Sequence, residues 1–298
     1  MTVSRSNTGG RAYLDLRSEA IRQGRPFSEM LNLYALEGFL DRLSRSAHVG
    51  NLVLKGGVLL AAFDTRRATR DIDLQADALS NDARAVEKVI YEIAEVPVDD
   101  GLIFTTSRSK AEVIRDDDEY SGVRVSIPCQ LETADVSFHV DVSVGDAIWP
   151  TPELIDLPRI LGGEVRVRGY SIEMVIAEKV VTAIQRGTAS TRWRDFCDIY
   201  LLSQSHTMSE TTLRGALQRV SEGRRTAMAP FSEVVAGYEV IAQTRWSAWV
   251  RKQGLAERLP NDFGEVLSWI ARFTDPILSA GDLGRQWDGS CAAWIAGF

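Results

Sequence analysis

Two aspartates, Asp71 and Asp73, stand two positions apart in the run Asp-Ile-Asp-Leu. If this run is a β-strand, both carboxylates point to one face of the sheet, and Ile72 and Leu74 point to the other face, toward a core. Two carboxylates several ångströms apart suit a hard divalent cation such as Mg²⁺. An isolated Asp-x-Asp pair is more often a solvated strand end than a metal site. The surrounding residues are therefore needed to distinguish the two.

A pair of glycines, Gly56 and Gly57, precedes these aspartates. The pair follows an apolar run at 52–54 that is typical of a buried strand, and an apolar stretch at 58–63 is long enough for a short helix. Glycines beside a strand end let backbone N–H groups approach a phosphate closely, although such a pair is more often only a turn. Enzymes of phosphoryl or nucleotidyl transfer combine a phosphate-binding backbone segment with a nearby metal site. Because the glycine pair and the Asp-x-Asp pair are close together in the chain, we favour such a transfer site over a simple turn and a solvated strand end.

A third carboxylate is offered by the stretch 136–144, in which apolar and polar residues alternate strictly. Asp141 belongs to its polar face, and His139 is interpreted as a neighbour on that face rather than a ligand. Strands disfavour aspartate, which makes Asp141 a candidate for the metal site. The acidic run at 116–119 is interpreted as a solvated turn.

The hydrophobic pattern predicts an α+β fold. Helical periodicity is present at 12–23, 27–47 and 82–95, and the section from 102 to 144 is rich in predicted strands. The Trp-Pro-Thr-Pro run at 149–152 is the expected boundary. We therefore expect a domain of residues 1–150 with a small mixed sheet flanked by helices, followed by a mainly helical domain of residues 151–298.

Two helices in the second half carry charged residues at regular spacing. Ser171 is a suitable N-cap for a helix at 172–186 that contains Glu178 and Lys179. A second helix, at about 192–203, places Asp195 and Asp198 on one face because they are three positions apart. Beyond residue 209 the pattern is helical nearly to the end.

Composition and charge exclude several classes of protein. With 45% hydrophobic and 25% charged residues, the chain is typical of a globular protein. Its net charge of −7 argues against a generally basic nucleic-acid binder but leaves room for local clusters of arginines. The three cysteines are too few and too widely spaced for a zinc pattern or a disulfide framework. No apolar run approaches a membrane span and the N-terminus does not resemble a secretion signal, so a cytoplasmic location is expected.

The order of motifs resembles the AbiEii/MenT-type nucleotidyltransferases, the toxin halves of toxin–antitoxin pairs and phage-abortive-infection systems. Their first motif is similar to Lys55-Gly56-Gly57 followed by Arg67-Ala68-Thr69-Arg70-Asp71-Ile72-Asp73. Their second is similar to Ala177-Glu178-Lys179-Val180 followed by Arg192-Trp193-Arg194-Asp195-Phe196-Cys197-Asp198-Ile199-Tyr200. The first motif alone belongs to the wider polymerase-β-like superfamily, and the second makes the resemblance specific to the family. Lys55 and Thr69 stand where the family more often has serine.

The resemblance implies a role for each matching residue. Asp71, Asp73 and Asp141 would hold Mg²⁺ or Mn²⁺. The family's third motif is loosely defined, so Asp146 is the alternative to Asp141. The phosphates of a nucleoside triphosphate would be contacted by Gly56, Gly57, Thr69, Arg70 and Lys179. Asp198 matches an essential aspartate and would orient Lys179. Asp71, Asp73, Asp141, Lys179 and Asp198 would form the catalytic set.

The resemblance also implies an acceptor and a partner. Relatives of the MenT type add nucleotides to the 3′ acceptor end of tRNA and so block translation. Arg166, Arg168, Arg192 and Arg194 are the candidates for contacts with the tRNA phosphates. A separately encoded antitoxin restrains such toxins, in some systems by phosphorylating a hydroxyl near the metal site, and Thr69 is the hydroxyl available here.

Three other interpretations remain open. The acidic net charge also suits a small-molecule nucleotidyltransferase that modifies cationic aminoglycosides. A degenerate relative that only binds a nucleotide or a protein partner is a second alternative, although all the expected ionisable positions are filled. The third is an unrelated α/β protein in which the motifs arose by chance.

Overall fold

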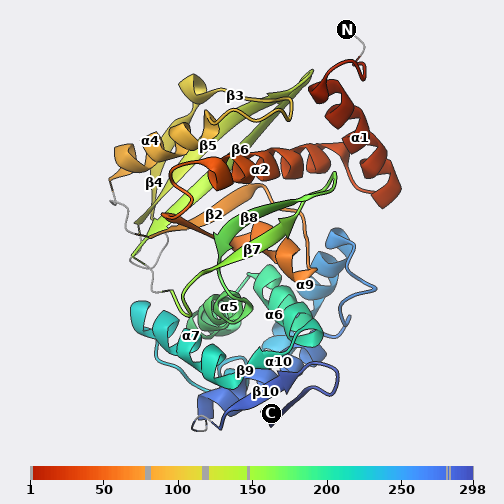
Figure 1. Ribbon diagram of the computed structural model, residues 1–298. Coiled ribbons are helices and arrows are strands. Elements are labelled where there is room, and N and C mark those ends of the chain that lie inside the picture. Colours follow the sequence, from red (N-terminus) through yellow and green to blue (C-terminus); the bar gives the residue numbers. More distant parts are fainter. Residues whose placement is uncertain are drawn as a thin grey trace. The chain divides into compact units, whose positions relative to one another are not determined.

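A computed structural model describes residues 3–77, 82–115, 121–145, 148–279, 281 and 283–297 (Figure 1). The chain divides into two compact units, the first made of residues 1–146 and 152–169 and the second of 147–151 and 170–298. Asp146 and the acidic run at 116–119 lie outside the described residues.

The first unit is a mixed sheet with helices. In its described part, eight strands form a sheet in the order β3-β5-β6-β2-β1-β8-β7, and β4 also pairs with β5. The strands are β1 (Leu52–Lys55), β2 (Asp71–Ala76), β3 (Leu102–Phe104), β4 (Lys110–Arg115), β5 (Ser121–Leu131), β6 (Ala134–Val144), β7 (Glu153–Pro158) and β8 (Glu164–Gly169). The helices are α1 (Thr8–Gln23), α2 (Phe27–Arg45), α3 (Gly56–Leu59) and α4 (Ala83–Ala94), with short 3₁₀ turns η1 (Leu60–Phe63) and η2 (Thr106–Arg108). The α+β class predicted from the sequence is confirmed.

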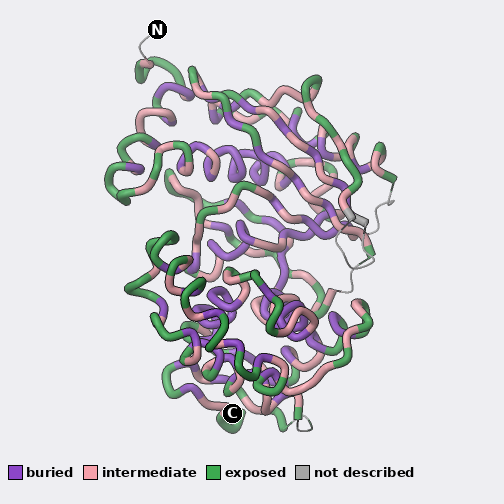
Figure 2. Tube along the Cα trace, turned by 180° about the vertical axis from the view of Figure 1, so that it is seen from behind, coloured by how far each residue is buried: buried purple, intermediate pink, exposed green. Residues whose placement is uncertain are grey.

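The helix α2 packs on the apolar face of the sheet. Every residue of α2 from Leu33 to Leu43 is buried, so the helix is covered on all sides there, and in Figure 2 it forms a continuous buried stretch. Phe39 of α2 meets Phe138 of β6 edge to face at 6.0 Å between ring centroids. The alternation predicted for β6 is confirmed, because Val136, Phe138, Val140 and Val142 are buried and the residues between them are not.

The boundary between the units differs from the predicted break after residue 150. The segment 147–151 belongs to the second unit, but the β7–β8 hairpin that follows returns to the first. The reason is strand pairing: β8 runs parallel to β1, with Gly169 opposite Leu54, and so extends the same sheet.

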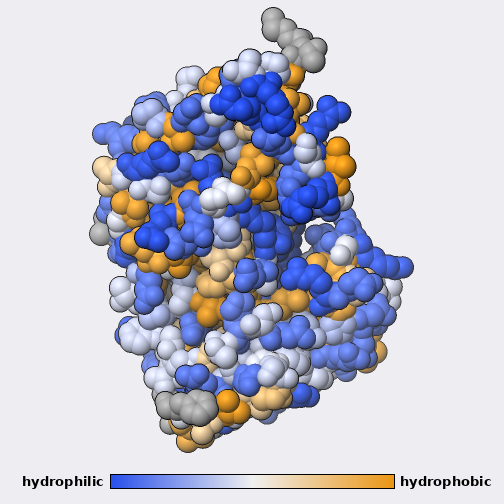
Figure 3. Space-filling view, turned by 45° about the vertical axis from the view of Figure 1, so that its right-hand side comes forward, coloured by the Kyte–Doolittle hydropathy of each residue, from blue (hydrophilic) through white to orange (hydrophobic). Residues whose placement is uncertain are grey.

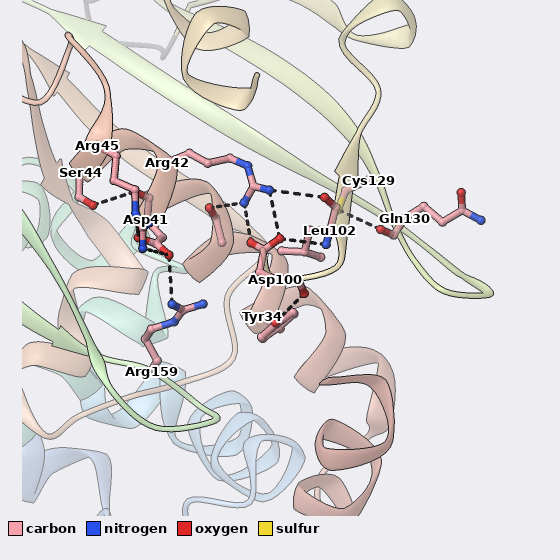
Figure 4. Close-up of polar contacts among 11 residues, drawn as sticks. Tyr34, Asp41, Arg42, Ser44, Arg45, Asp100, Leu102, Cys129, Gln130 and Arg159 are labelled. Atoms are coloured by element: carbon pink, nitrogen blue, oxygen red, sulfur yellow. Dashed lines mark hydrogen bonds and ion pairs between the residues drawn. The ribbon is translucent and has the colours of Figure 1, made fainter. Parts of the chain in front are cut away.

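Polar residues on α2 anchor two loops of the first unit (Figure 4). Arg42 donates from Nη1 and Nη2 to the two oxygens of Asp100, at 2.6 and 3.1 Å, and both side chains are almost fully buried. The Tyr34 hydroxyl donates to the backbone carbonyl of Asp100 at 2.8 Å. Next to Arg42 on α2, Asp41 accepts from Arg45 and from Arg159 of the β7–β8 turn. The helix thus fixes both the segment before β3 and the hairpin.

The same hairpin turn is tied to the stretch that leads into β2. Glu37 of α2 is 1% exposed, and its carboxylate accepts from the backbone N–H of Ile160 at 2.9 and 3.1 Å. Arg66 donates both to Glu37 and to the carbonyl of Pro158. Burial raises the pKa of Glu37, and Arg66 opposes that effect. Through Arg66, the segment just before Asp71 is held against the helix and the hairpin.

The second unit is mainly helical. Its helices are α5 (Ile172–Arg186), α6 (Trp193–Ser205), α7 (Glu210–Gly223), α8 (Phe231–Val234), α9 (Tyr238–Gln253) and α10 (Phe263–Ser279), with a 3₁₀ turn η3 (Gly187–Ala189). Aromatic rings form much of its core, and Phe263 contacts the rings of Trp193, Phe196, Tyr238 and Trp246 at 4.9–5.7 Å. All seven tryptophans of the chain belong to this unit: Trp149, Trp193, Trp246, Trp249, Trp269, Trp287 and Trp294.

The prediction of helix nearly to the end of the chain is wrong. The chain instead forms a small antiparallel sheet from β9 (Met208–Ser209), β10 (Arg285–Asp288) and β11 (Ala293–Ala296). Trp287 and Trp294 lie opposite each other on β10 and β11, and both rings contact Phe273 of α10, at 4.9 and 5.6 Å. Large aromatic residues suit such a half-buried pleated surface, and this tertiary packing decides the local structure.

A buried acidic residue connects this sheet to α7. Glu210 is 0% exposed and accepts from the backbone and guanidinium of Arg285, at 2.9–3.1 Å, and from Arg214 at 3.1 Å. The hydrogen bonds from Arg285 are the main reason that the pKa of Glu210 falls from its ordinary value near 4.5 to about 2. The position at the first turn of α7 also favours a negative charge.

Replacing Arg42 by alanine is expected to lower the free energy of unfolding of the first unit by about 3–5 kcal/mol, because Asp100 would keep a buried charge without its cation. Far-UV circular dichroism in urea follows the unfolding of both units, whereas tryptophan fluorescence follows only the second unit, so a loss of stability seen by circular dichroism but not by fluorescence reports on the first unit. The control is Arg5→Ala, whose pair with Asp15 is exposed and should contribute less than about 1 kcal/mol. Equal stabilities of Arg42→Ala and the wild type would contradict the role of this pair.

The Glu210 network predicts an acid-sensitive second unit. A lowered pKa in the folded state stabilises the protein above pH 4.5, and this contribution, about 3 kcal/mol at most, is lost as the pH falls toward 2. The variant Glu210→Gln should therefore be less stable at neutral pH and should lose less stability on acidification. Urea unfolding at several pH values, followed by tryptophan fluorescence, measures both. A parallel pH dependence in the two proteins would contradict the assignment.

Candidate active site

Three predicted carboxylates lie on one face of the first unit's sheet. The strands β2 and β6 are parallel neighbours, and their register places Asp73 opposite Asp141 and Asp71 opposite His139. All three aspartates are partly exposed, whereas Ile72, Val140 and Val142 on the opposite face are fully buried. The pleat of two adjacent strands therefore brings Asp71, Asp73 and Asp141 to the face away from the core.

The glycine pair is shaped around one of these aspartates. Gly56 has a φ of +67°, and a Cβ atom added there would lie 1.9 Å from Oδ2 of Asp73. A Cβ on Gly57 would lie 3.0 Å from the hydroxyl of Thr69. Both the backbone conformation and the close approach of Asp73 require glycine at position 56. The structure thus explains the glycine at position 56 by the space that Asp73 occupies. The contact of Gly56 and Gly57 with phosphates stays a prediction.

Sequence reasoning missed a residue that contacts the third carboxylate. Arg124 of β5 stands opposite Asp141 in the sheet and donates from Nε and Nη2 to its two oxygens, at 2.8 and 2.7 Å. This hydrogen bonding raises the pKa of the Arg124 guanidinium, and the nearby charge of Asp71 adds to the effect. The alternation of buried Val123 and Val125 around Arg124 was the available signal, since it puts Arg124 on the polar face.

Carboxylate oxygens are suitable ligands for a divalent cation. In this structure, however, the side chains of Asp71, Asp73 and Asp141 do not converge on one cation position. Among the described residues, no three Asp, Glu, His or Cys side chains are placed to hold a metal ion together. The two oxygens of Asp141 instead accept hydrogen bonds from the Arg124 guanidinium. Asp71 and Asp73, with Asp141 once released from Arg124, are the residues that would hold Mg²⁺ or Mn²⁺.

Lys179 in the second unit lies between two carboxylates. Its Nζ is 2.8 Å from Oδ2 of Asp198 and 3.1 Å from Oδ1 of Asp195. Ser171 caps α5 by accepting from the N–H of Met174, as the sequence predicts. The two aspartates share one face of α6, so the helix spacing predicted from the sequence explains the geometry. Both hold the ammonium in one place, with side-chain exposures of 11% for Lys179 and 4% for Asp198.

The other predicted contact residues are distributed over both units. Arg166 pairs with Asp156 through two hydrogen bonds of 2.6 and 3.0 Å, and Arg168 donates to Asp77 at 3.0 Å. Four of the predicted contacts are exposed, namely Arg70, Arg166, Arg192 and Arg194. The hydroxyl of Thr69 donates to the carbonyl of Asp71 at 3.3 Å.

A separate cavity of about 380 Å³ contains none of the predicted site residues. It lies among α2, the segment before β3 and the β7–β8 turn, and its lining residues are Tyr34, Asp41, Arg45, Val98, Asp99, Asp100, Arg159, Leu161 and Gly162. Asp41 pairs with two of its arginines and Asp100 with Arg42, while Asp99 is exposed at its rim. Because these charges balance one another, the cavity has no excess positive charge to attract a triphosphate.

A mixed sheet with several carboxylates on one face is the arrangement that the sequence predicts for a nucleotidyltransferase, and comparison with family models identifies the family. The model of the family "Nucleotidyl transferase AbiEii toxin, Type IV TA system" matches residues 38–269. The chain belongs to this family, and the resemblance drawn from its two motifs is confirmed.

Comparisons with individual proteins add little to this assignment. No curated protein matches the chain. The solved structure of JHP933 from Helicobacter pylori is similar at 16% identity and a TM-score of 0.49 over 83% of this chain and 92% of that one. Another H. pylori structure, described as a nucleotidyltransferase, is similar at 14% identity and a TM-score of 0.49 over 84% and 96% of the two chains. The family of the chain is shown by the match of residues 38–269 to the family model.

Membership of the family establishes an enzyme of the nucleotidyltransferase kind with a nucleotide substrate and a cognate antitoxin. Hydrophilic residues cover most of the face drawn in Figure 3, and hydrophobic ones are scattered between them. None of the helices in the described part of the chain is both long and apolar enough to cross a membrane.

The fit of Gly56 to Asp73 predicts that Gly56→Ala abolishes nucleotidyl transfer. The added methyl group would displace the carboxylate, and the left-handed backbone would add a further ~1–2 kcal/mol of strain. Incorporation of labelled nucleotide measures the effect. The control is Gly50→Ala, since position 50 is exposed and has nothing within 4 Å of an added Cβ. Full activity of Gly56→Ala would show that the position of Asp73 is not needed.

Proposed function

We propose that this protein is the toxin of a toxin–antitoxin pair and transfers a nucleoside monophosphate from a nucleoside triphosphate to the 3′ acceptor end of tRNA. This modification would block translation in the cytoplasm. The observation that supports the proposal is the register of β2 and β6, which places Asp73 beside Asp141 and Asp71 on the same face. In a chain of this family, such a carboxylate face is the natural place for the transfer chemistry.

The chemistry assigned to each residue follows from charge. Mg²⁺ or Mn²⁺ bound at these carboxylates would supply the acidity that activates the acceptor hydroxyl and the charge that shields the departing pyrophosphate. Asp71 and Asp73 are the proposed principal ligands, and Gly56 leaves the space that the Asp73 carboxylate occupies. A triphosphate also needs cations from the protein, and Arg70 is an exposed candidate.

Lys179 is the second proposed source of positive charge. Its ammonium is held by Asp195 and Asp198, so its position is fixed before any substrate arrives. Preorganised charge is more effective than charge that must first be oriented, because no reorganisation accompanies the reaction. We therefore assign Lys179 to the phosphates of the nucleotide and Asp198 to the positioning of Lys179.

The acceptor is proposed from family resemblance and from the arginines. Arg166, Arg192 and Arg194 are exposed, and exposed ion pairs such as that of Arg166 with Asp156 contribute about 0–1 kcal/mol. A phosphate of tRNA can therefore replace the aspartate at little expense in free energy. The small-molecule alternative, a cationic aminoglycoside as acceptor, is supported by the net charge of −7.

The decisive experiment incubates the protein with each labelled nucleoside triphosphate and either total tRNA or an aminoglycoside. We expect incorporation into tRNA, located at the 3′ end by sequencing. Asp71→Ala, Lys179→Ala and Asp198→Ala should each reduce it by at least about 100-fold, as expected for groups that stabilise a transition state. Circular dichroism confirms that each variant is folded.

The matched control is Asp135→Ala. Asp135 lies on the same strand and the same face as Asp141 but is exposed and away from the pair with Asp73. This variant should keep wild-type incorporation. Full incorporation by Asp71→Ala would refute the site, and labelling of the aminoglycoside in place of tRNA would refute the acceptor while leaving the enzyme class intact.

A further inference from the structure

Three neighbouring strands place a cation and two anions at one level of the sheet, with a third anion two residues away on the same face. Arg124 of β5 lies opposite Asp141 of β6, and Asp141 lies opposite Asp73 of β2. Asp71 stands two residues along β2 from Asp73, on the same face. The guanidinium of Arg124 therefore belongs to the carboxylate face itself, and its side chain is 32% exposed against 15% for Asp141.

The pairing occupies the very atoms that a metal would use. Both oxygens of Asp141 accept a hydrogen bond from Arg124, in the parallel fork geometry that arginine and carboxylate form most strongly. Arginine keeps its proton at any relevant pH, so loss of a proton cannot free the carboxylate. A divalent cation that takes the side of Asp141 now facing Arg124 must displace the guanidinium.

Once separated from Asp141, Arg124 needs another anionic partner, and the nucleoside triphosphate substrate can be that partner. Glu112 of β4 lies across the sheet from Arg124, but its side chain is exposed and its pairing would be weak. A triphosphate offers several anionic oxygens, and the arginine fork matches their geometry as it matches a carboxylate. When the metal and the nucleotide bind together, Asp141 can exchange the guanidinium for the metal cation. Arg124 can exchange the carboxylate for the anionic phosphates.

We propose that Arg124 occupies Asp141 in the resting enzyme, and that its side chain moves to form hydrogen bonds with the triphosphate when the metal and the nucleotide bind. This inference rests on the proposed function, because it uses the same carboxylate face. It makes binding of the metal and of the nucleotide mutually dependent. Each ligand strengthens the other by the same factor, since both favour the state in which the ion pair is open.

The test measures Mn²⁺ binding to the full-length protein without nucleotide, by electron paramagnetic resonance. Wild-type protein should bind Mn²⁺ weakly, and Arg124→Gln should bind it at least about fivefold more tightly, because Asp141 is no longer occupied. The KM for the nucleoside triphosphate should change in the opposite sense and rise at least about tenfold, because the nucleotide loses its guanidinium. Effects of opposite sign on the two ligands distinguish a switch of partners from a general loss of structure.

Two further variants complete the design. Arg45→Gln removes another arginine that binds an aspartate through two hydrogen bonds, at 2.7 and 3.1 Å, on α2 and outside the proposed site, and should change neither affinity. Arg124→Lys keeps the charge without the fork and should fall between Arg124→Gln and the wild type in both measurements. Thermal unfolding shows whether each variant is folded.

The outcomes separate the inference from the proposed function. If Mn²⁺ binding to the wild type is abolished by Asp71→Ala but Arg124→Gln changes neither affinity, the inference fails and the metal site stands. A joint weakening of both ligands in Arg124→Gln also overturns the inference, because it indicates a structural role only. If Asp71→Ala and the wild type bind Mn²⁺ equally, the metal site fails and the inference fails with it.

Discussion

The parallel pairing of β2 with β6 is the constraint from which the candidate site follows. It sets Asp73 beside Asp141, and a shift of one residue would turn Asp141 into the core and bring a valine to the carboxylate face. The register is held by the other face, where Ile72, Leu74, Val140 and Val142 are completely buried under the helix layer. The free energy of apolar burial therefore fixes the relative positions of acidic residues that would otherwise repel one another.

The helix α2 supports this arrangement from the opposite side. Its apolar residues cover the core face, and its polar residues hold the loops at either end of the sheet. Glu37 and Asp41, one turn apart, bind the β7–β8 turn, and Glu37 also binds Arg66 in the segment that leads into β2. The first aspartate of the Asp-x-Asp pair thus begins a strand whose approach is fixed by buried ionic contacts. Such contacts contribute more to a defined geometry than to the net free energy of folding.

Local patterns in the sequence predicted the parts of the structure that local forces decide. The alternation at 136–144 assigned Asp141 to the polar face, and the capping residue Ser171 located the start of α5 at Ile172. The spacing of Asp195 and Asp198 placed them on one face of α6, where both reach Lys179. These features depend on residues a few positions apart, so the sequence contains the information directly.

The features that were missed depend on contacts between distant segments. Arg124 could be assigned to a polar face, but its pairing with Asp141 depends on the register of β5 against β6. The β10–β11 hairpin forms because Trp287 and Trp294 pack on Phe273, which no local period reveals. The return of the chain to the first unit after residue 151 has the same origin, since β8 finds its partner in β1, over a hundred residues earlier.

This return has a consequence for how the protein is made. The ribosome releases β1 early, but the parallel partner of β1 is encoded only at residues 164–169, after a segment that belongs to the other unit. During synthesis β1 keeps one unpaired edge until β8 has emerged, and unpaired strand edges are prone to association with other chains. The nascent toxin therefore passes through a stage at which its carboxylates are already synthesised but the sheet that carries them is still open.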